Sequence, residues 1–308
     1  MQLPRFILDS FPLEHVIDRH PLTVTPDMFL MDVIALMSQT ISSHLDNPKT
    51  LSNFYNRGRT SCALVMDGSQ LKGIFTERDT VALAASQQTL DDIRVGNVMT
   101  SQVITLPIEK FSDVHTALTL LRQHHIRHLP IVQERGQLLG LITFTTLGHA
   151  VHPSPLQRIW RVGDVMTSKV VHASPTASLL QLSQLMRQHS VSCVVITQDQ
   201  EKEAANSNRE KWGDETSPFC LAPIGIVTER DIVQFKALGF DFHELQAHVV
   251  MSTPLFLMKP EDTLWDAHQN MRKRQLRRLV VADRQGNLKG VITESSLLKT
   301  LNSMSLNH

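Results

Sequence analysis

Aromatic side chains are scarce in this chain of 308 residues: they make up 5% of it, with a single tyrosine and three tryptophans. The hydrophobic core must therefore be mainly aliphatic, and the 42% hydrophobic fraction is that of a folded globular protein. Net charge is also absent, because 30 Lys and Arg balance 30 Asp and Glu. Proteins that coat nucleic acid normally carry a basic excess, so we expect no nucleic-acid partner.

Cysteines are few and long apolar runs are missing. Cys62, Cys193 and Cys220 form no CxxC pair, which favours a reducing compartment over a disulfide framework. Cys62 and Cys193 lie in apolar segments and are interpreted as core residues rather than redox thiols. The start of the chain has no signal-peptide pattern, and no run of about 18 apolar residues occurs. We therefore expect a cytoplasmic protein with no membrane partner.

One phrase occurs four times along the chain. The first and third copies, GIFTERD and GIVTERD, begin 152 residues apart and end in aspartate. The second and fourth copies, GLITFTT and GVITESS, lack the aspartate, so the repeats alternate in an ABAB pattern. The four copies occupy Gly73–Asp79, Gly140–Thr146, Gly225–Asp231 and Gly290–Ser296.

A second phrase precedes each copy. It is VGNVMTSQVITLP from Val95, VGDVMTSKVVHASP from Val162 and HVVMSTPLFLMKP from His248, with a degenerate LEHVIDRHPLTVTP from Leu13. Helical apolar spacing follows it, then a short apolar run, a turn, the G-x-x-T strand and a helix that begins after a threonine N-cap. Each unit is therefore predicted to fold as strand–helix–strand–strand–helix, an α/β (α+β) class.

The predicted units occupy residues 1–90, 91–152, 157–240 and 245–304. Units this small bury little core alone, so we expect them to pair, two in each half of the chain. The first unit carries an insertion at 42–60, and in the third a polar insertion at 199–218 replaces the hairpin turn. The insertion in the third unit is either a tolerated surface loop or a docking site for a partner.

The four ordered copies resemble cystathionine-β-synthase (CBS) domains arranged as two Bateman modules, from about Leu13 to Leu301. The resemblance implies a regulatory protein that binds an adenosine-containing ligand between paired units and signals to an effector protein. The expected ligand is AMP, ADP or ATP, with S-adenosylmethionine and cyclic dinucleotides as alternatives. We expect no catalytic residue, catalytic cofactor or bound metal, since no Walker, GxGxxG, GxSxG or HExxH motif occurs. An intramolecular four-unit disc or a homodimer is the expected assembly.

The resemblance assigns ribose binding to the aspartate of the odd copies, with the motif threonine beside it. These residues are Thr76 with Asp79, and Thr228 with Asp231. One carboxylate can accept hydrogen bonds from both ribose hydroxyls, and such charge-assisted bonds are strong. The alternative is that both aspartates only favour a helix N-terminus, as Glu77 and Glu229 are also expected to do.

Each pocket is also expected to borrow residues from the paired unit. Two of the borrowed residues, Arg127 and Arg277, are predicted to face a phosphate of the ligand. The alternative is that both are ordinary surface cations. The reciprocal positions hold the neutral Ser61 and Ser192, and Thr146 and Ser296 replace the aspartate in the even units. For the Asp79 site the borrowed residues are Ser101, Val103, Ile104, Ile126, Arg127 and His128; for the Asp231 site they are Ser252, Thr253, Leu255, Leu276, Arg277 and Arg278.

Other interpretations remain open at this stage. His124 and His128 have the i,i+4 spacing of a helical metal face, although helix-end cations or phosphate contacts are favoured because no carboxylate or thiol accompanies them. Instead of a sensor, the chain could be a ligand-free scaffold or dimerisation module. It could also be the regulatory part of a larger signalling protein.

Overall fold

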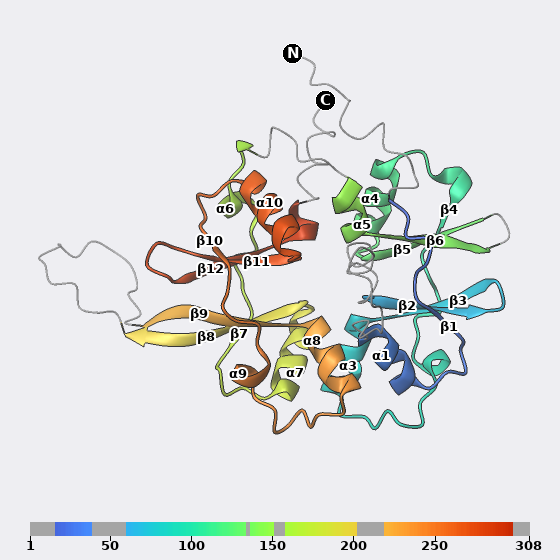
Figure 1. Cartoon of the computed structure of the whole chain (residues 1–308), viewed down its shortest axis with the longest axis horizontal. Helices are drawn as coiled ribbons and strands as arrows, with labels where there is room; N and C mark the ends of the chain where they lie inside the picture. The colour runs from blue at the N-terminus through green and yellow to red at the C-terminus, as the bar shows by residue number, and fades with distance from the viewer. Residues whose placement is uncertain (1–15, 39–59, 134–135, 151–157, 202–218, 298–308) are drawn as a thin grey trace, which may run out of the picture. The chain divides into compact units, whose positions relative to one another are not determined.

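The computed structural model describes residues 16–38, 60–133, 136–150, 158–201 and 219–297 (Figure 1). Within these ranges the predicted strand–helix–strand–strand–helix order is confirmed in the first two repeats. The first repeat consists of β1 (Thr23–Val24), α1 (Leu30–Ser38), β2 (Cys62–Asp67), β3 (Gln70–Thr76) and α3 (Glu77–Ala85). The second consists of β4 (Leu106–Pro107), α4 (Val114–Gln123), β5 (His128–Val132), β6 (Leu138–Thr143) and α5 (Phe144–Ala150), preceded by the short helix η2 (Val95–Asn97) and with η3 (Ile108–Lys110) after β4.

The third and fourth repeats follow the same order. The third consists of α6 (Val162–Val165), β7 (His172–Ala173), α7 (Leu179–His189), β8 (Cys193–Glu201), β9 (Phe219–Thr228) and α8 (Glu229–Ala237). The fourth consists of α9 (Ala247–Val250), β10 (Leu257–Met258), α10 (Leu264–Arg274), β11 (Arg278–Ala282) and β12 (Leu288–Thr293), with helical residues at 294–297.

Each repeat forms a three-stranded sheet whose first two strands are parallel and whose last two are antiparallel. The helix between the first two strands provides the crossover that a parallel pair needs, whereas a tight turn joins the antiparallel pair in the first, second and fourth repeats. Gly68, Gly136 and Gly286 lie in these turns with φ of 59°, 76° and 84°, a region that glycine enters without steric cost. The β8–β9 hairpin is longer than predicted, because residues 199–201 of the expected insertion continue β8. Residues 202–218, and 42–59 of the first insertion, lie outside the described residues.

The described residues form two compact units. The first contains the first two repeats together with α8, and the second contains α6, β7, α7, β8, β9 and the fourth repeat. The third repeat is therefore divided between the units where β9 ends at Thr228 and α8 begins at Glu229.

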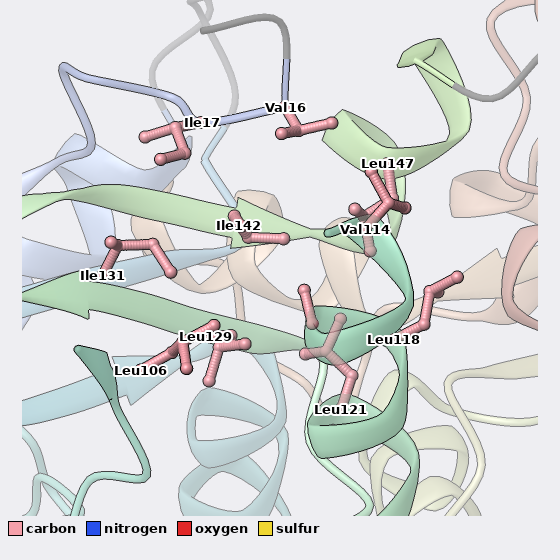
Figure 2. Close-up of a cluster of buried hydrophobic side chains, with 11 residues drawn as sticks. Val16, Ile17, Leu106, Val114, Leu118, Leu121, Leu129, Ile131, Ile142 and Leu147 are labelled. Carbon is pink, nitrogen blue, oxygen red and sulfur yellow. The ribbon is translucent and has the colours of Figure 1, made fainter. Parts of the chain in front are cut away.

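The core of the second repeat extends beyond its own sequence (Figure 2). Val16 and Ile17, from the start of the described chain, are buried in it. The next residue, Asp18, exchanges two backbone hydrogen bonds with Leu141 of β6, at 2.9 and 2.8 Å. The segment before the first repeat thus completes the core of the second repeat. The other buried members are Leu106, Val114, Ala117, Leu118, Leu121, Leu129, Ile131, Ile142 and Leu147.

A separate cluster joins the two sheets of each unit. In the first unit Cys62, Leu64 and Ile74 pack with Leu141 of the second repeat, and in the second unit an equivalent cluster links the third and fourth repeats. Burial raises the pKa of the Cys62 thiol, in agreement with its interpretation as a core residue. Repeats therefore pair within each unit through one face of their sheets.

The glycine of each repeated phrase lies against the other repeat of its unit. A side-chain carbon at Gly73 would overlap the Met99 side chain, and at Gly225 and Gly290 it would overlap Met251 and Met166. The methionines belong to the second recurring phrase, so the two phrases recur together because each fills the gap left by the other. At Gly140 the neighbours are Ile17 and the backbone oxygen of Asp18, which belong to the degenerate first copy of that phrase.

Helix α8 packs against α1 and α3 of the first unit. Its Val233 joins the core cluster of the first repeat. The residues of α3 that are buried include Val81, Ala84 and Ala85. Helix α8 therefore covers the apolar face of α3.

Candidate functional site

Asp79 lies in the first turn of α3 and caps it. Its Oδ2 accepts hydrogen bonds from the Thr76 backbone N–H at 2.7 Å and from the Thr76 hydroxyl at 2.8 Å. The prediction of Thr76 as N-cap is confirmed. Burial raises the pKa of Asp79 above its ordinary value, although the two bonds from Thr76 act in the opposite direction. The carboxylate is therefore held in one orientation at some cost in solvation.

The same position caps the helix in the even repeats without a charge. The Thr146 hydroxyl accepts from the Thr143 N–H at 2.9 Å, and the Thr146 N–H donates to the Thr143 hydroxyl at 3.1 Å. In the fourth repeat the Ser296 hydroxyl accepts from the Thr293 N–H at 3.3 Å. Capping is thus shared by these repeats, and the negative charge distinguishes Asp79 from its even counterparts.

His128 brings the first two repeats together beside this helix start. Its Nε2 lies 2.7 Å from the Ser61 hydroxyl oxygen, and the Ser61 carbonyl accepts from the Glu77 N–H at 3.1 Å. His128 is the first residue of β5, whereas α4 ends at Gln123 with His124 as its C-cap. The i,i+4 metal face is therefore wrong, because the two histidines do not share a helix. Among the described residues no three His, Cys, Asp or Glu side chains are grouped to hold a metal ion.

The apolar residues predicted for the first pocket flank the junction of the two repeats. Val103 packs against the cluster that joins the two sheets, while Ile104 and Ile126 pack against the second-repeat core. Ser101 is exposed and follows Thr100, whose backbone exchanges two hydrogen bonds with Ile74 near the end of β3. The segment from Ser101 to Ile104 therefore runs from the edge of β3 to the second-repeat core.

Arg127 forms an ion pair that sequence reasoning did not foresee. Its Nη1 lies 2.6 Å from Oε2 of Glu229, a residue that is 1% exposed. Burial alone would lower the pKa of Arg127, but the Glu229 carboxylate, with further contributions from Glu77 and Asp79, raises the pKa above its ordinary value. The alternative interpretation of Arg127 as an ordinary surface cation is wrong, since it neutralises a buried carboxylate.

Two further ion pairs cross between α3 and α8. Arg230 Nε lies 3.2 Å from Glu77 Oε1, and Arg78 Nε lies 3.5 Å from Glu229 Oε1. Both glutamates are buried, so they do more than favour the helix N-termini. The sequence signal that could have predicted these ion pairs is the Glu-Arg dipeptide that the odd copies share. When two equivalent helices meet, the Glu of each helix can pair with the Arg of the other.

The residues predicted for the second pocket are divided between the two units. Asp231 lies on α8 in the first unit, and the others lie in the second. The Arg278 guanidinium donates to the Ser192 carbonyl, and the Thr253 hydroxyl donates to the Ile224 carbonyl at 3.0 Å. Leu276 is exposed. The remaining predicted residues of this unit are Thr228, which ends β9; Ser252, whose backbone pairs with Ile226; Leu255, which packs on the inter-sheet cluster; and Arg277, whose carbonyl accepts from the Glu294 N–H.

The four repeats thus share one fold and are joined in pairs through their sheets. The model of the CBS domain matches residues 13–85, 95–152, 162–203 and 247–303. The chain belongs to the CBS domain family, whose members are generally regulatory.

Individual relatives are distant. The chain is 28% identical to the uncharacterized protein MK0525 of Methanopyrus kandleri over 45% of its own length and 61% of that protein. It is 30% identical to the CBS domain-containing protein YhcV of Bacillus subtilis over 47% of its length and 86% of that protein. The crystal structure of protein MJ1225 from Methanocaldococcus jannaschii covers 94% of this chain and 99% of its own, with a TM-score of 0.69 and 18% identity, which shows a shared fold. No helix among the described ranges is long and apolar enough to cross a membrane.

Proposed function

We propose that the chain is a regulatory sensor of adenine nucleotides, with Asp79 as the ribose ligand of a first site and Asp231 of a second. The observation that carries the proposal is the charge pattern of the first unit. A carboxylate oriented by Thr76 and a guanidinium, Arg127, influence each other electrostatically at the junction of two repeats. Capping alone does not require this charge, because Thr146 caps the equivalent helix without it.

The chemistry of a nucleoside phosphate matches this arrangement. The Asp79 carboxylate accepts from the ribose hydroxyls, and the planar guanidinium of Arg127 suits a phosphate. Val103, Ile104 and Ile126 supply apolar surface for the adenine ring, with Ser101 and His128 as polar neighbours. Among the described residues Asp79 Oδ1 accepts no hydrogen bond, which leaves this oxygen to the ligand.

The second site is proposed by equivalence of sequence. Asp231 and Thr228 repeat the motif of the first site, and Ser252, Thr253, Leu255, Leu276, Arg277 and Arg278 repeat its borrowed positions. Occupancy of the two sites is read by an effector protein, and the chain acts as a homodimer or as an intramolecular disc. As in other ligand-linked equilibria, the ligand favours the arrangement that binds it more tightly.

Isothermal titration with AMP, ADP, ATP, S-adenosylmethionine, GMP and CMP tests the proposal. Adenosine-containing ligands should bind, and GMP and CMP should not. At a hundred times its dissociation constant a ligand should stabilise the native state by about 2.7 kcal/mol, visible as a thermal shift. Binding of all nucleotides equally, or of none, would contradict the proposal. Arg127→Ala and Arg277→Ala should weaken the binding of phosphorylated ligands and leave the affinity for adenosine unchanged.

The second candidate function is a ligand-free scaffold. It is favoured by the capping bonds, since Asp79, Thr146 and Ser296 all stabilise a helix start without a ligand. Under this alternative Asp79→Ala changes stability only, and no nucleotide produces a thermal shift.

A further inference from the structure

The starts of α3 and α8 carry the same Glu-Arg pair and bury both glutamates in the first unit. Glu77 is 5% exposed and Glu229 is 1% exposed. Removing a carboxylate from water costs several kcal/mol unless a cation neutralises it, so each glutamate depends on its arginine partner. Arg230 serves Glu77, and Arg78 serves Glu229.

Arg127 breaks this symmetry. It gives Glu229 a second and shorter ion pair, at 2.6 Å against 3.5 Å for Arg78. Among the described residues Glu77 has one ion pair, with Arg230. Arg127 is also the cation assigned above to the ligand phosphate. The guanidinium fork that would hold a phosphate is therefore already engaged by a carboxylate of the same chain.

We propose that Glu229 is an internal competitor for the ligand phosphate at the first site. This inference rests on the proposed function. A phosphate that engages Arg127 replaces Glu229 Oε2 and leaves Glu229 with Arg78 as its cation. Adenosine has no phosphate and leaves the pair intact. The first site therefore discriminates less strongly in favour of phosphorylated ligands than Arg127 alone would.

The competition also has a mechanical consequence. Glu229 is the first residue of α8, which packs on α1 and α3 and continues directly from β9. Losing its shorter ion pair loosens the start of α8 within the first unit. Phosphate binding at the first site would thereby affect the junction of Thr228 and Glu229, where the third repeat is divided between the two units.

Titration calorimetry of a neutral variant tests the competition. All proteins carry Asp231→Ala, so that only the first site is measured, and AMP and adenosine are the probes. Glu229→Gln should tighten AMP binding by about tenfold or more and change adenosine binding by less than about twofold. Glu77→Gln is the matched control, because it neutralises the equivalent buried glutamate, which forms its ion pair with Arg230 and not with Arg127. It should raise the AMP-to-adenosine affinity ratio by much less than Glu229→Gln does.

An unchanged or lower AMP-to-adenosine affinity ratio in Glu229→Gln overturns the inference while the proposed function stands. If the Asp231→Ala protein binds neither probe, or Asp79→Ala added to it has no effect, the proposed function and this inference both fail. Should Glu229→Gln not fold, hydrogen exchange of the Asp231→Ala protein decides. Amides of Glu229–Ala237 should exchange faster with AMP than with adenosine, and equal exchange overturns the inference.

Discussion

Asp79 has two roles in this account, helix cap and ribose ligand, and substitution can separate them. Asp79→Ala removes the acceptor of two bonds from Thr76, at 2.7 and 2.8 Å, together with the charge. Asp79→Asn keeps an amide oxygen that can accept from the same groups and removes only the charge. The two variants therefore differ in capping and agree in lacking a carboxylate.

The expected magnitudes follow from these contacts. Losing the cap should cost Asp79→Ala about 1 kcal/mol of unfolding free energy in the absence of ligand. Asp79→Asn should be at least as stable as the unsubstituted protein near neutral pH, since burial raises the pKa of Asp79 and thus opposes its ionised form. Asp79→Ala also loses two charge-assisted hydrogen bonds to the ribose, which water partly replaces. The affinity of the first site for AMP should therefore fall by about 2–4 kcal/mol, or roughly 30- to 1000-fold.

Urea unfolding without ligand and calorimetric titration with AMP measure the two effects. Thr146→Ala is the control, because it should lose about the same capping energy and bind AMP normally. If Asp79→Asn binds AMP with two sites and unaltered affinity, the ribose assignment is wrong and Asp79 is a cap only. Loss of stability in both variants would contradict the electrostatic argument.

Three other predictions concern packing, pH and thiol chemistry. Gly140→Ala should destabilise the protein by about 1–3 kcal/mol in urea unfolding, and by more than Gly73→Ala does. The new side-chain carbon at position 140 would lie 2.5 Å from the rigid backbone oxygen of Asp18, whereas at Gly73 the main obstacle is a flexible methionine side chain. Equal losses of stability in the two variants would argue against this contact. Because burial raises the folded-state pKa of Asp79, its contribution to stability is present below the unfolded-state pKa and is lost as pH rises through the folded-state pKa. The affinity of the first site for AMP should fall on acidification at a higher pH than an ordinary aspartate would cause. AMP titrations from neutral to acidic pH should show this fall, and Asp79→Asn should abolish it at the first site. Cys62 is buried and burial raises its pKa, so iodoacetamide should modify it only after unfolding, and rapid native labelling would contradict its place in the core.

Much of the fold could be predicted because it is written in short segments. The order of elements depends on apolar spacing within a dozen residues, and the caps at Thr76 and Thr143 depend on a partner three residues away. The turn at Gly68 needs only a positive φ. Repetition of these local signals four times identified the family without any long-range information.

What the tertiary structure alone decided involves residues far apart in the chain. Arg127 and Glu229 are 102 positions apart, and their pairing depends on α8 of the third repeat packing in the first unit. His128 meets Ser61 rather than His124 because a strand begins where the spacing suggested a continuing helix. Local patterns fix backbone conformation, since those hydrogen bonds are short-range, but the partner of a buried charge depends on which distant helix covers it.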